Sequence, residues 1–123
     1  MRARVSFIVL ACVACRQAPR APRADAGASP AACASTLASY DALVVAGGAC
    51  SVDADCECFQ GGVSTKSACG GVTDRATATK LEALRAEYEH ASCDALSCAA
   101  SLCRPVCVGE RCTNGEDAPP RAK

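Results

Sequence analysis

Apolar residues recur at helical spacing in two segments of this 123-residue chain. Ser29 suits an N-cap, Pro30 suits the first helical turn, and the glycines at positions 47 and 48 suit a helix end. The pattern therefore predicts a first helix over about residues 30–46. Its apolar stripe consists of Cys33, Leu37, Tyr40 and Val44.

The second segment, about residues 74–91, carries the stronger helical pattern. Thr73 or Asp74 suits its N-cap. Arg85 and Glu89 are four residues apart on the outer side, where opposite charges can pair. The predicted buried face consists of Ala78, Leu81, Leu84, Tyr88 and Ala91.

Shorter patterns indicate β-structure around the second helix. The stretch CECFQGGV (56–63) alternates polar and apolar residues before a Gly-Gly turn, which predicts a short strand. The stretch RPVCVGERC (104–112) is typical of a hairpin that turns at Gly109 and Glu110. Residues 113–123 have the composition of a disordered tail. The fold class expected is therefore small α+β.

Composition shows that packing alone will not stabilise such a fold. Half of the chain counts as hydrophobic, but small alanine and cysteine residues supply much of that share, and there is no tryptophan. Cysteine is dense enough for a secreted disulfide scaffold. We expect about five disulfides that close loops of about ten to twenty residues and contribute about 2–4 kcal/mol each, with the connectivity left open. The expected half-cystines are Cys33, Cys50, Cys56, Cys58, Cys69, Cys93, Cys98, Cys103, Cys107 and Cys112.

The first fifteen residues, MRARVSFIVLACVAC, have the layout of an export signal. Two arginines precede the apolar run 5–14, which is too short to cross a bilayer as a helix. The endings VLAC and CVAC resemble a bacterial lipobox, which implies lipidation of Cys15, or alternatively of Cys12. Arg16 follows Cys15 where an aspartate would favour the inner membrane, so the resemblance implies the outer membrane. The alternative is an ordinary secreted protein.

These features divide the chain into four parts. They are a signal peptide at 1–14, a lipidated cysteine with a flexible tether at 15–32, a disulfide-rich domain at 33–112 and the tail at 113–123. The tether is rich in proline and alanine, which suits an extended spacer.

Two segments of the domain carry a family resemblance. CSVDADC (50–56) and CVGERC (107–112) resemble the opening and closing segments of cysteine-rich modules in secreted proteins and lipoproteins of myxobacterial type. A long insertion with the second helix separates them here, which departs from the compact repeat. The resemblance implies an extracytoplasmic disulfide-rich module and supplies no catalytic residues.

The remaining metal and redox patterns are weak. No C-x-x-C zinc knuckle follows the signal. The pair Cys56 and Cys58 suggests redox exchange, but strand alternation more simply gives each sulfur its own partner. Asp53, Asp55 and Glu57 alternate as calcium ligands can, but the aspartates also suit turns in which carboxylates accept backbone N–H bonds.

A catalytic site is not predicted. His90 is the only histidine, expected in solvent, and no G-x-S-x-G motif occurs. The loop 58–69 is flanked by cysteines and carries Lys66 and Ser67, an arrangement that suits the reactive loop of a trypsin inhibitor.

The sequence thus predicts a non-catalytic, lipid-anchored binding or envelope-interaction module at the outer membrane or cell surface. A serine protease inhibitor acting through Lys66 and a calcium-dependent module are the alternatives. No cofactor is expected, and the protein partner is left open. A formal net charge of zero, with no basic patch among aromatics, excludes nucleic acid as an expected partner.

Overall fold

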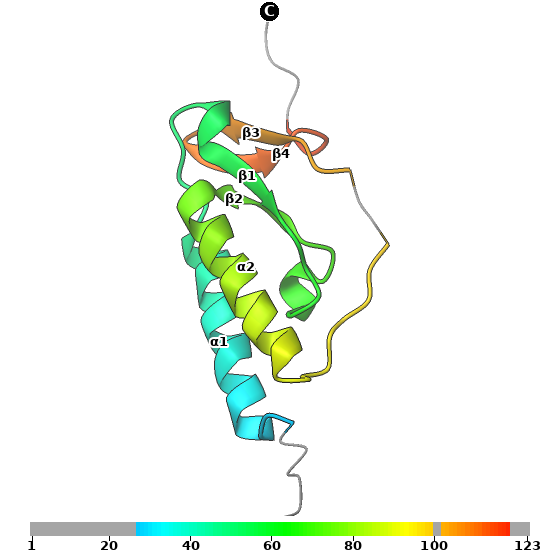
Figure 1. Cartoon of the computed structure of the whole chain (residues 1–123). Coiled ribbons are helices and arrows are strands. Elements are labelled where there is room, and N and C mark those ends of the chain that lie inside the picture. Colours follow the sequence, from blue (N-terminus) through cyan, green and yellow to red (C-terminus); the bar gives the residue numbers. More distant parts are fainter. Residues whose placement is uncertain (1–26, 100–101, 119–123) are drawn as a thin grey trace, which may run out of the picture.

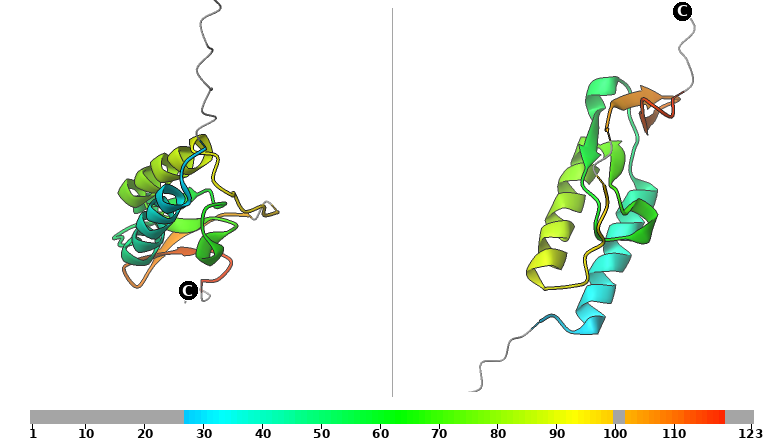
Figure 2. Two further views of the ribbon diagram at one scale, coloured as in Figure 1. Left: turned by 90° about the horizontal axis from the view of Figure 1, so that it is seen from below. Right: turned by 90° about the vertical axis from the view of Figure 1, so that its right-hand side faces the viewer.

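The computed structural model describes residues 27–99 and 102–118. Helices α1 and α2 lie side by side and run in opposite directions, with sheet β1–β2 packed beside α2 and hairpin β3–β4 at the end where α2 begins (Figures 1 and 2). The predicted small disulfide-rich α+β fold is confirmed. The elements in chain order are α1 (Pro30–Ala46), η1 (Asp53–Asp55), β1 (Cys56–Phe59), η2 (Thr65–Ser67), β2 (Gly71–Asp74), α2 (Arg75–His90), β3 (Pro105–Val108) and β4 (Arg111–Asn114).

The membrane-related predictions fall largely on other parts of the chain. The predicted signal peptide 1–14, the lipidation candidates Cys12 and Cys15, and residues 16–26 of the tether lie outside the described residues. Within the described part, no helix is long and apolar enough to span a bilayer.

The predicted caps set the helix boundaries. The Ser29 hydroxyl accepts a hydrogen bond from the backbone N–H of Ala32 at 3.3 Å, and α1 ends at Gly47. Of the two candidate caps for α2, Asp74 takes the position, and its Oδ1 accepts from the backbone N–H of Thr77 at 3.0 Å. The expected boundaries of both helices are therefore confirmed to within one residue.

The hydrophobic core is small and lies between the helices and the β1–β2 turn. Tyr40 is fully buried, its ring meets Phe59 edge-on with centroids 6.4 Å apart, and its hydroxyl donates to the carbonyl of Gln60 at 3.0 Å. The predicted stripes of both helices face this core, with their outer members half-buried. The fully packed cluster is Tyr40, Phe59, Val63, Ala78, Leu81 and Tyr88.

The β-structure matches the sequence in part. Hairpin β3–β4 turns at Gly109 and Glu110, whose φ values of 57° and 62° suit a two-residue hairpin turn. Strand β2 was not predicted, because its four residues run directly into α2. Strand β4 continues to Asn114, whose side chain binds the backbone of Arg104 and Leu102. The predicted tail from residue 113 therefore begins too early.

All ten predicted half-cystines are paired. Their separations of 29 to 60 residues show that the expected short loops were wrong. One bridge joins the start of α1 to the end of α2, and the other four join residues 50–69 to residues 98–112. The C-terminal part of the domain, residues 98–112, is thus covalently fixed to β1 and its neighbours. The pairs are Cys33–Cys93, Cys50–Cys107, Cys56–Cys112, Cys58–Cys103 and Cys69–Cys98.

Candidate functional site

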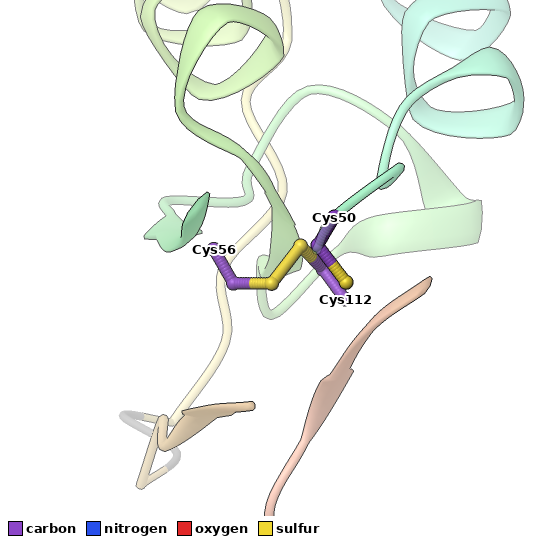
Figure 3. A group of neighbouring side chains, drawn as sticks. All are labelled: Cys50, Cys56 and Cys112. Carbon is purple, nitrogen blue, oxygen red and sulfur yellow. A yellow bond between two sulfur atoms is a disulfide. The ribbon is translucent and has the colours of Figure 1, made fainter. Parts of the chain in front are cut away.

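Two of the five disulfides lie against each other at the start of β1. Figure 3 shows the Cys56–Cys112 bridge with Cys50 beside it. The Sγ atoms of Cys50, Cys56 and Cys112 lie within 4.8 Å of one another. Cys56 is bonded to Cys112, and Cys50 is bonded to Cys107. These four cysteines are the sulfur cluster. Cys56 is only 4% exposed, and the other three are half-buried.

Backbone hydrogen bonds bring the chain segments of the sulfur cluster together. The N–H of Cys50 donates to the carbonyl of Glu110 at 3.1 Å, and the N–H of Cys112 donates to the carbonyl of Gly48 at 2.7 Å. A β-bridge between Ala49 and Arg111 lies between these two bonds. The segment before Cys50 is therefore an added edge of the β3–β4 hairpin.

The acidic residues between Cys50 and Cys56 shape the loop that joins them. The Oδ2 atom of Asp55 accepts from the N–H groups of Ser51 at 2.8 Å and Val52 at 3.0 Å. These bonds, that of Ser51 first, lower the pKa of Asp55. The Oδ1 atom of Asp53 accepts from the N–H of Cys107 at 2.8 Å, which ties the loop to β3.

This geometry does not favour the calcium alternative. Asp53 and Asp55 accept backbone N–H bonds, as the competing turn interpretation expected, and Glu57 is exposed on β1. Among residues 27–99 and 102–118, the only group of three possible metal ligands in mutual reach is the sulfur group. Its sulfurs are bonded in pairs, so they lack the thiolate charge that binds zinc.

The strand pair Cys56 and Cys58 behaves as the simpler interpretation expected. Both sulfurs leave the same face of β1, and each has a distant partner, Cys112 and Cys103 respectively.

Lys66 and Ser67 lie in the 3-10 turn η2 rather than in an extended loop. Lys66 Nζ is 3.4 Å from Asp41 Oδ2 on α1, and Ser67 is only 7% exposed. The buried hydroxyl of Ser64 also donates to Asp41. Because a protease binds a reactive loop as an extended strand, this compact turn does not favour inhibition through Lys66.

A broad hollow lies beside the β1–β2 turn. Its volume is about 910 Å³, it is open to solvent, and residues 95, 96, 98 and 99 form part of its wall. Its wall mixes the apolar side chains of Phe59 and Leu96 with the charged side chains of Arg85 and Glu89. His90, which was expected in solvent, is exposed at the last residue of α2.

The sequence did not predict the sulfur cluster, although a signal for it was present. The two segments that carried the family resemblance, 50–56 and 107–112, each begin and end with cysteine. The structure bonds their first cysteines to each other and their last cysteines to each other. No family model, curated protein or solved structure matches this chain. The structure defines a small disulfide-rich α+β protein, and its five bridges indicate an oxidising, extracytoplasmic environment.

Proposed function

We propose that the protein is a lipid-anchored module of the bacterial outer membrane or cell surface that acts by binding and not by catalysis. The observation that carries the proposal is the use of its cysteines. Ten of the twelve cysteines are consumed in disulfides, which leaves only Cys12 and Cys15 for another purpose. Cys12 and Cys15 are each the last residue of a lipobox-like sequence. A lipid on Cys15, with Cys12 removed in the signal peptide, would account for all twelve cysteines.

The binding role rests on the hollow beside the β1–β2 turn. Ligand sites are usually concave, and the wall of this hollow is mixed, with more polar than apolar surface. The wall at Leu96 is anchored at several points, because its backbone N–H donates to the carbonyl of Gly62 at 2.7 Å and the Cys69–Cys98 bridge follows two residues later. A wall that is held in place favours binding because less conformational freedom is lost on association.

The anchor is tested by expressing the full chain in a bacterium that has the lipoprotein pathway. We expect wild type to partition into the detergent phase and to incorporate labelled palmitate. Cys15→Ala is expected to lose both properties, while Cys12→Ala serves as the matched control and retains them. Loss of both properties in Cys12→Ala alone would show that Cys12 is the lipidated residue. Retention of both properties in both single variants and in the double variant contradicts a lipid anchor.

The binding face is tested in the same cells with a photo-crosslinking residue. Position 96 lies in the wall of the hollow, and position 45 on α1 is an exposed control, since Val45 is 68% exposed. We expect discrete crosslinked species from position 96 and none at matching mass from position 45. Identical patterns from the two positions contradict the hollow as the binding face.

A further inference from the structure

The sulfur cluster places one disulfide within reach of another. Cys50 Sγ lies within 4.8 Å of both sulfurs of the Cys56–Cys112 bridge, and its own bond to Cys107 is half-exposed. Thiol–disulfide exchange needs a thiolate close to a disulfide sulfur. We propose that the sulfur cluster is a disulfide-exchange site, in which these two long-range bridges convert into two local ones.

The exchange is balanced if an external monothiol acts as a catalyst. Its thiolate attacks Cys107 Sγ, forms a mixed disulfide there and releases Cys50 as a thiolate. The Cys50 thiolate attacks Cys56 Sγ, forms Cys50–Cys56 and releases Cys112 as a thiolate. The Cys112 thiolate then attacks the mixed disulfide at Cys107, forms Cys107–Cys112 and returns the monothiol. No net oxidation or reduction occurs, and the proton count is unchanged.

The final local bridge fits the hairpin geometry. Cys107 and Cys112 face each other in the β3–β4 register. Their backbone N–H groups donate outside the hairpin, to Asp53 and Gly48, so they form a non-hydrogen-bonded pair. Such pairs have Cα atoms about 4.5 Å apart, which is within the range that a disulfide spans.

Exchange would change how the hairpin is held. In the structure, the Cys50–Cys107 and Cys56–Cys112 bridges clamp β3 and β4 to the loop before β1 and to β1 itself. After exchange, both new bridges lie within their own segments. The hairpin would then keep one covalent link to the sheet, Cys58–Cys103, which precedes β3 by two residues. The site would therefore act as a thiol-operated release of the β3–β4 hairpin.

The deciding experiment uses the full wild-type chain, incubated under native conditions with reduced glutathione and quenched with acid and N-ethylmaleimide. Cleavage before Asp53 and after Arg111 separates the members of each local pair. We expect Cys50–Cys56 and Cys107–Cys112 to appear together in at least about a tenth of the molecules, while Cys33–Cys93 stays intact. Failure of glutathione to open the Cys50–Cys107 bridge, or opening without either local bridge, overturns the proposal.

A pair of variants isolates the central step. Cys107→Ser leaves a free thiol on Cys50, and we expect part of the maleimide label to move to Cys56 or Cys112. Cys98→Ser is the matched control, because it frees Cys69, which lies outside β1 and belongs to no three-sulfur group among the described residues. Its label is expected to stay on Cys69. Label that remains entirely on Cys50 in folded Cys107→Ser contradicts exchange within the cluster. Neither experiment depends on the lipid anchor.

Discussion

The carboxylate of Asp74 joins the end of α1 to the start of α2. Its Oδ1 accepts from the N–H of Thr77 at 3.0 Å, which caps α2, and its Oδ2 accepts from the N–H of Gly48 at 2.8 Å. The bond from Gly48, followed by that from Thr77, holds the pKa of Asp74 at about 2, compared with 3.8 for the free side chain. We therefore expect Asp74 to be a major polar contributor to stability.

The size of the effect follows from these two bonds. Loss of an N-cap costs about 1 kcal/mol, and the N–H of buried Gly48 left without a partner costs about 1–3 kcal/mol. Asp74→Ala is therefore expected to lower the free energy of unfolding by about 2–4 kcal/mol. Asp74→Asn keeps the cap but loses the second acceptor oxygen, so we expect a loss of about 1–3 kcal/mol. The lowered pKa of Asp74 is consistent with a loss of this size. Because the carboxylate is half-exposed, water screens its interactions and reduces their contribution to stability.

The pH dependence gives the sharper test. Because the folded pKa lies below the unfolded one, Asp74 stabilises the fold above about pH 4, and this stabilisation is lost as the pH falls toward about 2. The stability difference between wild type and Asp74→Asn should therefore shrink across this window. Asp55 also has a lowered pKa, but it is present in both proteins and its effect cancels. Urea unfolding followed by circular dichroism, with disulfides intact, measures the difference at pH 7 and 2.5. An equal difference at the two pH values would refute this reasoning.

Three further stability predictions use the same urea assay. Replacing both Cys33 and Cys93 by alanine should cost about 3–4 kcal/mol, since their bridge closes a long loop between the helices; a loss below about 1 kcal/mol would contradict this. Gly61→Ala should lower the free energy of unfolding more than Gly109→Ala does, because a Cβ at Gly61 would lie 2.2 Å from backbone atoms. At Gly109 there is open space, so the substitution costs only about 1 kcal/mol for the positive φ. The reverse order would contradict the packing around Gly61. Glu110→Gly should stabilise the hairpin by about 0.5–1 kcal/mol by relieving a positive φ, and a destabilised variant would show that its side chain has another role.

Local patterns in the sequence predicted much of the secondary structure. The stripe and caps of both helices are local features, and so is the turn at Gly109 and Glu110, so each could be identified from neighbouring residues. Strand β2 could not, because its four residues have no alternation of their own and depend on pairing with β1. Residues 113 and 114 were misjudged for the same reason, since only pairing with β3 orders them.

The sulfur cluster was beyond sequence reasoning for a different reason. The even number and the high density of cysteines predicted that every cysteine of the domain would form a disulfide. They did not predict the partners, because pairing is set by the packing of distant segments. The short-loop expectation failed because the long segment between residues 58 and 98 folds back and returns the C-terminal cysteines to β1. The sequence around Asp53 and Asp55 was compatible with two interpretations, a calcium site and a turn in which the carboxylates accept backbone N–H bonds. Only the positions of the backbone N–H groups around them favour the turn.

We infer that oxidising surroundings let five disulfides stabilise a domain with only a small core. A peptide map under non-reducing conditions, made from full-length protein trapped with maleimide in intact cells, tests it most directly. We expect no free thiol between residues 33 and 112, and the five linkages of the structure as the main species. Reactive thiols on several of these cysteines, or a zinc ion bound to them, would contradict it.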